Sequence, residues 1–373
     1  MGINSTDDNL DFNEWTGEPV SPAPKQLVAE KDEEKVVKEK QIDTTIIPQE
    51  APTIDIMDAF ITGLSANPDD IENAKTITLI DGFMEYNTVG ILYGESGSGK
   101  SMLMLSVCVY LLENTIIDKV NYFDFDNGKA DQKNRGIHLL LRKYGNRFNY
   151  INLDTIDSAD LTPPQILNKL IDAPVKGSTP YERQFFVFDT MGELAEGSLG
   201  KDDVMRPLLD KFKKLRSMGA TMQTIHHNTK SKEDVSFFGS NYIKIKIDAL
   251  WHLTAKESEN KGKMEFALNM QKNRSGNLKD SAFIIDPVTH TLEGGDYAIA
   301  SMNEDDTFFV ASIRGILAGC EMINQGELLT AIDKKKDDRT ALKQLQKYDG
   351  VFWKSERLAN KNNSLMYSES KHT

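Results

Sequence analysis

The stretch that most constrains the fold is Gly-Glu-Ser-Gly-Ser-Gly-Lys-Ser at residues 94–101, which matches the pattern G-x-x-x-x-G-K-[ST] at every fixed position. An apolar run at 88–93 precedes it and predicts a buried strand, and an apolar run at 100–114 predicts a helix after it. In this context the glycines let backbone N–H groups point inward as a nest for anions, above the positive end of the helix dipole. The sequence therefore predicts a phosphate-binding loop, and a glycine turn that matches by coincidence does not account for both flanks.

Each residue type in the loop has an expected task in binding a nucleoside triphosphate. Lys100 is expected to reach the β- and γ-phosphates, and the hydroxyl of Ser101 is expected to bind Mg²⁺. The residues expected to hold the nucleotide are Gly94, Glu95, Ser96, Gly97, Ser98, Gly99, Lys100, Ser101 and Met102.

Composition narrows the class of protein. The 373 residues carry a net charge of −13, which argues against coating nucleic acid by bulk attraction but permits a local basic channel. Cys108 lies in the apolar helix after the loop and is expected in the core rather than in a disulfide. No apolar stretch has the length of a membrane span, and no signal peptide opens the sequence, so we expect a cytoplasmic protein with no membrane partner.

The sequence divides into three parts. Residues 1–55 are acidic and poor in large apolar side chains, which predicts a disordered tail; a tether or partner-binding arm is the alternative. Residues 56–300 alternate strand-like runs with helix-like runs, one of which predicts a single helix at 130–144. This alternation predicts an α/β domain with a mostly parallel sheet covered by helices on both faces. The later strands are joined by short turns, so that edge of the sheet is expected to be antiparallel.

Residues 305–373 predict three short helices followed by a hairpin, the outline of a small winged-helix-like domain. Basic side chains on and before the third helix are candidates for phosphate contacts, although solvated lysines on a packing domain are an equal alternative. These residues are Lys334, Lys335, Lys336, Arg339, Lys343 and Lys347.

Two predicted strands end in carboxylates. Asp189 follows the apolar run Phe185–Phe188 and is the candidate for the Walker B acid, which would share Mg²⁺ with Ser101. Asp126 ends the second strand and is the candidate for the group that activates the attacking water, with Asp124 as the runner-up. A turn formed by Asp-Asn-Gly explains the second of these sites nearly as well.

Two further strand ends carry polar groups. His226 and His227 end an apolar strand, where a histidine can contact the γ-phosphate; metal binding by the pair is the weaker alternative, because neighbours on a strand point in opposite directions. Lys272 and Arg274 end a later strand, where an arginine reaching across a subunit boundary can neutralise charge on the transferred phosphoryl group. A basic surface turn is the alternative for this second pair.

Together these segments resemble the RecA-like ATPases of the hexameric replicative helicase group, with the RepA type closer than the DnaB type. The loop at 94–101 resembles the family's Walker A motif, and Asp189 its Walker B acid. Asp126 stands where the family usually has a catalytic glutamate, with Arg135 after it. The run 226–230 resembles the family's His-His-x-x-Lys motif, and Lys272-x-Arg274 resembles its paired trans-acting fingers.

The resemblance covers roughly residues 60–300 and implies a RecA-like P-loop NTPase core that uses ATP and Mg²⁺. It implies a homo-oligomeric ring, a hexamer in that family, with nucleotide between neighbours and single-stranded nucleic acid, DNA favoured, in the channel. The matching channel loops are Met191–Lys201 and Ser231–Asn241; a flexible lid is the alternative for the second. We therefore expect a replicative helicase or replication or recombination ATPase of plasmid or phage type. A nucleotide-dependent switch or loader, and less favourably a phosphotransferase, are the alternatives.

Overall fold

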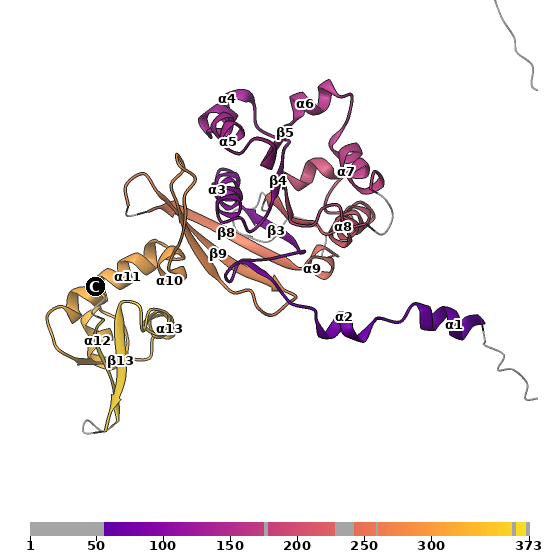
Figure 1. The fold of residues 1–373 in the computed structure, drawn as a ribbon. Coiled ribbons are helices and arrows are strands. Elements are labelled where there is room, and N and C mark those ends of the chain that lie inside the picture. The colour runs from indigo at the N-terminus through magenta and orange to yellow at the C-terminus, as the bar shows by residue number, and fades with distance from the viewer. Residues whose placement is uncertain (1–55, 175–177, 228–241, 259, 360–362, 371–373) are drawn as a thin grey trace, which may run out of the picture. The chain divides into compact units, whose positions relative to one another are not determined.

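The computed structural model describes residues 56–174, 178–227, 242–258, 260–359 and 363–370 (Figure 1). The expected tail at 1–55 and the expected channel loop Ser231–Asn241 lie outside the described residues. Contacts divide the chain into two units, 1–72 and 73–373. In the first unit the helices are α1 (Ile56–Gly63) and α2 (Pro68–Glu72).

Helix α1 carries an exposed apolar stripe. Met57, Phe60 and Ile61, followed by Leu64, are each more than half exposed. Their spacing of three, four and seven residues is that of one helix face. A stripe of this kind usually becomes buried when a chain associates with a partner.

A nine-stranded sheet forms the centre of the second unit, in the order β11-β10-β9-β8-β3-β7-β6-β4-β5. All neighbours from β8 to β5 are parallel, whereas β8, β9, β10 and β11 pair antiparallel. This arrangement confirms the expected mostly parallel sheet with an antiparallel edge. The strands are β3 (Val89–Gly94), β4 (Lys119–Asp124), β5 (Phe148–Asn152), β6 (Gln184–Asp189), β7 (Thr221–His227), β8 (Ala249–Glu257), β9 (Met264–Asn273), β10 (Ser281–Ile285) and β11 (Leu292–Gly294).

Helices cover both faces of this sheet (Figure 1). Successive side chains of β3 point to opposite faces, so Leu92 packs in one hydrophobic core and Ile91 in the other. The first core contains α3 (Lys100–Glu113) and α5 (Ile137–Tyr144), and Cys108 is fully buried there. The second core contains α7 (Pro163–Asp172) and α8 (Asp202–Ser217).

Shorter elements complete the unit. A two-stranded ribbon, which the sequence did not predict, precedes β3. The short elements are β1 (Thr78–Ile80), β2 (Met84–Glu85), α4 (Lys129–Asn134), η1 (Gly145–Arg147), α6 (Leu153–Ser158), η2 (Met191–Leu194), α9 (Tyr242–Lys246) and α10 (Tyr297–Ala300).

Two expected boundaries were wrong. The single helix predicted at 130–144 is two helices, α4 and α5, because Gly136 between them takes a left-handed conformation with φ of 71°. The strand predicted to run to Asp126 ends at Asp124, so Asp126 lies in the following turn. Both differences change which side chains reach the candidate site.

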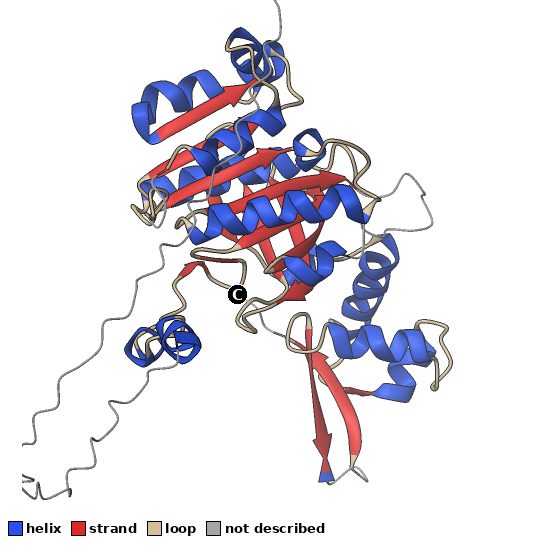
Figure 2. Cartoon of the chain, turned by 90° about the vertical axis from the view of Figure 1, so that its right-hand side faces the viewer, coloured by secondary structure: helices blue, strands red, loops and turns tan. Residues whose placement is uncertain are grey.

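The C-terminal residues contain the expected helices and hairpin, together with a short additional strand (Figure 2). Their apolar side chains form a separate core that includes Phe309, Leu345 and Trp353. The three strands pair in the order β12-β14-β13. The elements are α11 (Glu304–Leu317), β12 (Ile323–Asn324), α12 (Gln325–Ala331), α13 (Arg339–Lys347), β13 (Trp353–Leu358) and β14 (Ser364–Glu369).

Candidate nucleotide-binding site

The loop between β3 and α3 depends on its glycines. Gly97 and Gly99 have φ of 79° and 81°, in the left-handed region that favours glycine. A Cβ at Gly99 would lie 3.0 Å from the ring of Phe266, and one at Gly94 would lie 2.7 Å from the carbonyl oxygen of Leu253. The loop therefore packs closely against β8 and β9, which leaves no room for larger residues at these two positions.

Lys100 extends back over the loop from the first turn of α3. Its ammonium donates to the carbonyl oxygens of Gly94 and Glu95, at 3.0 and 2.5 Å. Burial lowers the pKa of Lys100, while the carboxylates of Asp189 and Glu95 act in the opposite direction. The cation is thus held at the mouth of the anion nest, where phosphate oxygens would contact it.

Asp189 lies at the carboxyl end of β6, and it is almost fully buried. Its carboxylate accepts from the hydroxyl of Tyr122 at 2.9 Å and is hydrogen-bonded with the side chain of Ser101. Burial raises the pKa of Asp189 to about 6, and the charge of nearby Asp124 adds to the effect. This carboxylate therefore lacks enough nearby positive charge to stabilise its ionised form.

Ser101 and Asp189 fit a magnesium ion. Mg²⁺ prefers oxygen ligands and is usually held by one or two protein groups together with phosphates and water. A hydroxyl and a buried carboxylate beside a phosphate-binding loop supply such a pair. Within the described ranges, no three His, Cys, Asp or Glu side chains cluster as a metal site, so the ion would depend on the nucleotide for its other ligands.

A cavity of about 390 Å³ brings together four of the six residues that the sequence predicts to take part in catalysis. Lys100, Asp126, Asp189 and His227 all line it, together with glycines of the loop. They come from the carboxyl ends of β3, β6 and β7 and from the turn after β4, because parallel strands end at the same edge of the sheet. Strand β7 lies between β3 and β6, so His227 at its tip lies between the loop and Asp189.

The two alternative acids after the second strand have different environments. One carboxylate oxygen of Asp124 accepts from the N–H groups of Asp126 and Asn127 and from the side chain of Asn127, and the other accepts from the hydroxyl of Tyr150. Asp124 is therefore buried and engaged in shaping the turn. Asp126 is exposed and borders the cavity.

His227 faces the cavity with its ring half-buried, whereas His226 is buried at the neighbouring position of β7. Burial and the charge of Lys100 lower the pKa of His227, so the ring is neutral at pH 7. Its Nδ1 atom is buried and has no hydrogen-bond partner in the part of the chain that the structure describes. The ring therefore borders the cavity, whereas its Nδ1 atom lies in the interior.

Arg135 lines the same cavity, although the sequence motifs predict no separate role for it. It follows α4, where the break at Gly136 turns the chain, and His290 is hydrogen-bonded to its carbonyl oxygen at 2.9 Å. The charge of Arg135 lowers the pKa of Asp189, against the larger effect of burial. Gly136, directly after Arg135, was the sequence signal for a break at this point. Because we predicted one continuous helix there, we did not expect Arg135 to reach the cavity.

Residues 69–233 match the family described as an AAA domain. This part of the chain is a P-loop ATPase domain with an α/β fold. No curated protein matches the sequence. The glycine loop, the buried acid and the strand between them lie together at one edge of this domain.

Three solved structures are similar to the chain at low sequence identity. The flagellar accessory protein FlaH from Methanocaldococcus jannaschii is 16% identical, with a TM-score of 0.39, over 57% of this chain and 90% of that one. A DnaB-like replicative helicase is 15% identical, with a TM-score of 0.46, over 65% and 69%. A further structure, of an ATPase domain alone, is 15% identical, with a TM-score of 0.44, over 65% and 99%.

Lys272 and Arg274 do not join the cavity of their own ATPase domain. They lie at the end of β9 that pairs with the start of β8, beside the amino end of β3. The phosphate-binding loop follows the opposite end of β3, and six residues of strand separate the two ends by roughly 16–20 Å. The ammonium of Lys272 donates to the carbonyl of Lys244, and Arg274 contacts Asp248.

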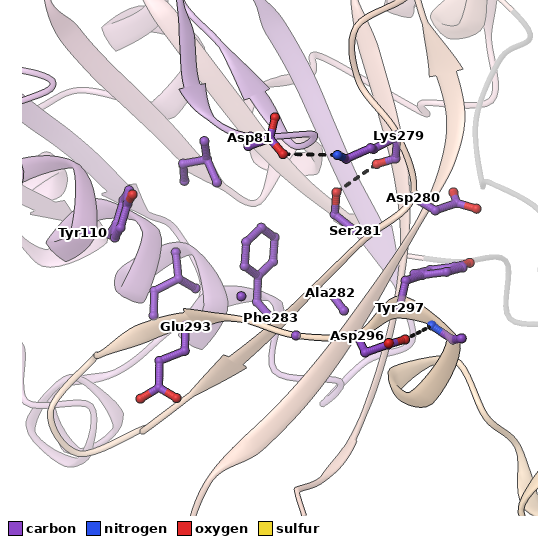
Figure 3. A pocket seen from close by; sticks show the side chains of 15 residues that line it. Asp81, Tyr110, Lys279, Asp280, Ser281, Ala282, Phe283, Glu293, Asp296 and Tyr297 are labelled. Carbon is purple, nitrogen blue, oxygen red and sulfur yellow. Dashed lines mark hydrogen bonds and ion pairs between the residues drawn. The ribbon is translucent and has the colours of Figure 1, made fainter. Parts of the chain in front are cut away.

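A different cavity, of about 550 Å³, lies along β10 and β11 of the ATPase domain (Figure 3). Several of its polar side chains are already engaged by other groups of the chain. Lys279 pairs with Asp81 at 3.1 Å, and Asp296 accepts from the N–H of Ala298 at 2.8 Å. Gly294 and Gly295 precede α10 in this cavity, but the Asp296 carboxylate already caps the first N–H groups of that helix, so the cavity does not compete with the loop as a phosphate site.

None of the helices in the described ranges has the length and apolar character needed to cross a membrane.

Proposed function

We propose that the chain is an ATP-hydrolysing motor of the replicative helicase type that works as a ring of identical subunits on single-stranded DNA in the cytoplasm. The observation that supports this most directly is the cavity in which the loop, Asp126, Asp189 and His227 meet. The ATPase domain accounts for nucleotide hydrolysis. The ring of subunits, the binding of single-stranded DNA and a role in DNA replication are further parts of the proposal. We also propose that the chain has a core at 56–300 and a winged-helix-like domain at 305–373.

The loop and Lys100 would bind the phosphates of ATP, and Ser101 and Asp189 would hold Mg²⁺, which offsets charge on the β- and γ-phosphates. Asp126 is the exposed acid at the cavity, so it takes the role of accepting the proton of the attacking water. Asp124 keeps the turn in shape and thereby positions Asp126. The ring of His227, which lines the cavity, would contact the γ-phosphate and respond when that group leaves.

Lys272 and Arg274 take the role of fingers for the nucleotide of a neighbouring subunit. Their distance from their own cavity supports this assignment, because at the far end of β3 they cannot reach the phosphates bound in the same chain.

A nucleotide-dependent switch or loader is the second candidate. The observation that favours it is Asp126 itself, because an aspartate is one methylene shorter than the glutamate found at this place in the resembling family. A shorter side chain places the carboxylate farther from the attacking water, and slower hydrolysis suits a switch better than a motor.

The ATPase rate, measured against protein concentration with and without single-stranded DNA, separates the two. A ring motor gains specific activity as concentration rises and is stimulated by the strand, and Lys100→Ala abolishes its turnover. A switch binds ATP and changes its oligomeric state with little turnover. Indifference to both concentration and DNA contradicts the motor.

Mixing variants tests the trans fingers. Arg274→Ala subunits keep their own loop, and Lys100→Ala subunits keep their finger, so a mixture regains activity that neither variant has alone. Asp126→Ala mixed with Lys100→Ala is the matched control, because both lesions lie on the same side of the interface and no activity returns. Equal behaviour of the two mixtures excludes a finger role for Arg274.

A further inference from the structure

The C-terminal elements follow the order helix, strand, helix, helix, strand, strand. Helices α12 and α13 are joined by the turn 332–338, and the ribbon of β13 and β14 comes next in the chain. Strand β12 pairs with β14, which fixes the ribbon beside the helices. A helix pair joined by a short turn and followed by a ribbon is the arrangement by which helix-turn-helix proteins present their second helix.

Helix α13 has one apolar and one basic face. Ala341 and Leu345 are buried in the C-terminal core. Arg339, Lys343 and Lys347 recur every four residues on the other side, where each is exposed. Arg339 and Lys343 are therefore the open cations of this basic face, whereas Lys347 at its end is paired with Asp306 of α11.

The helix is held firmly in this orientation. Asp338 caps its first turn by accepting from the N–H groups of Thr340 and Ala341, each at 3.0 Å. The largely buried carboxylate of Asp306 on α11 accepts from Gln344 and from Lys347, each at 2.9 Å. The indole of Trp353 in β13 donates to the carbonyl of Leu345 at 2.9 Å, which joins the ribbon to the helix.

The turn before α13 adds positive charge at the amino end of this helix. Lys334, Lys335 and Lys336 are all exposed there. From Lys334 to Lys347 the chain has six basic and two acidic residues, although the whole protein has a net charge of −13. Cations gathered against an acidic background form a local field that attracts a polyanion.

We propose that α13 and the turn 334–338 bind double-stranded DNA, with α13 in the major groove and its cations on the phosphates. The major groove is about 12 Å wide and admits a helix. The exposed face of α13 has no aromatic side chain, whereas surfaces for single strands stack bases on aromatic rings. This duplex site is separate from the ATPase cavity and from the channel of the proposed motor.

One nearby side chain would favour a single strand instead. Phe308 of α11 is 76% exposed and borders a cavity that Lys334, Lys343 and Lys347 also line. A single ring next to these lysines provides one stacking position, whereas the basic face of α13 offers the open cations Arg339 and Lys343. The variant Phe308→Ala therefore distinguishes the two ligands.

Fluorescence anisotropy of the full chain with a short labelled duplex, over a series of salt concentrations, tests the proposal. Arg339→Gln/Lys343→Gln is expected to weaken duplex binding about tenfold or more and to reduce the slope of log affinity against log salt by about two. The control Arg142→Gln/Lys169→Gln removes two exposed cations from α5 and α7 and should leave both quantities unchanged. Phe308→Ala should likewise leave duplex affinity unchanged.

Two results would overturn the proposal. One is equal duplex affinity for wild type and for the folded Arg339→Gln/Lys343→Gln variant, with folding checked by thermal denaturation. The other is tighter binding of single-stranded DNA than of the duplex, together with loss of that preference in Phe308→Ala. If the double variant does not fold, Lys335→Gln/Lys343→Gln is measured in its place. Lys100→Ala should still bind the duplex, so failure of the ATPase proposal remains distinguishable from failure of this one.

Discussion

Arg274 is joined to Asp248 twice, through its backbone N–H to the carbonyl of Asp248 at 3.0 Å and through its guanidinium to the carboxylate at 3.3 Å. The same buried carboxylate accepts from Arg216 at 2.7 and 2.8 Å and from the N–H of Val89 at 2.9 Å. One acid therefore ties the proposed finger to α8 and to the amino end of β3. The position of Arg274 is set by the core of the ATPase domain rather than by a surface turn.

Replacing Asp248 should destabilise the domain. Asp248→Asn removes the charge that two arginines share, so we expect the free energy of unfolding to fall by about 3 kcal/mol. Asp118→Asn is the matched control, because Asp118 pairs with Arg183 at 3.0 Å but is exposed, and about 1 kcal/mol or less is expected. Urea denaturation measures the free energy of unfolding of both variants. Equal losses would show that the buried network of Asp248 stabilises the domain no more than an exposed ion pair does.

Substitution of Asp124 should affect stability, whereas substitution of Asp126 should affect catalysis. The Asp124 carboxylate accepts four hydrogen bonds, and the asparagine in Asp124→Asn cannot accept all of them, so we expect the free energy of unfolding to fall by about 2–3 kcal/mol. Asp126→Asn should leave the melting temperature unchanged and lower the turnover number about a hundredfold or more. Steady-state ATPase assays and thermal melts decide this, and normal turnover in Asp126→Asn contradicts the proposed base.

Asp189→Asn should stabilise the protein when divalent metal is chelated. The pKa of Asp189 is about 6 in the folded chain against 3.8 in the reference state, so the folded state holds the proton more tightly. Wild-type stability therefore falls as pH rises from about 4 to about 6, and stays lower above that range. The uncharged variant escapes this loss and should exceed wild type by about 2–3 kcal/mol at neutral pH.

Melts in chelator across this pH range measure the difference between Asp189→Asn and wild type. Asp118→Asn is the control of opposite sign, since a hydrogen bond from Arg183 lowers the pKa of Asp118. That variant should lose stability relative to wild type as pH rises toward 3.8, and the difference between the two should stay constant from about 4 to about 6. If the gain in stability of Asp189→Asn over wild type did not change with pH, burial would not raise the pKa of this carboxylate as proposed.

Two loop glycines separate backbone strain from steric overlap. Gly97 and Gly99 have nearly the same positive φ, so alanine strains the backbone by about 1 kcal/mol at either position. Only at Gly99 does the new Cβ meet the buried ring of Phe266, at 3.0 Å. Gly99→Ala should therefore lower the melting temperature of the nucleotide-free protein clearly more than Gly97→Ala, and equal shifts would contradict the packing of the loop on β9.

The phosphate-binding loop was predictable because its strand, glycines and helix are consecutive, so local pattern and local geometry coincide. The order of strands along the chain likewise indicated the parallel sheet and its antiparallel edge. The choice between Asp124 and Asp126 was not predictable from the sequence. It depends on where β4 ends and on the hydroxyl of Tyr150 from a neighbouring strand.

Arg135 and the finger pair show the same limit. Arg135 reaches the cavity only because the chain breaks at Gly136, whereas periodicity alone predicts one helix there. Lys272 and Arg274 were predicted as a pair, but the antiparallel pairing of β9 with β8 places them at the far end of the sheet. Both facts depend on contacts between residues distant in sequence.

The separation of loop and finger along β3 has a consequence for counting active sites. When neighbours meet head to tail, each contact joins the loop of one subunit to the arginine of the next. An open row then has one fewer complete site than it has subunits, and only closure of the row makes the numbers equal. The stoichiometry of ATP turnover per subunit therefore reports whether the assembly is closed.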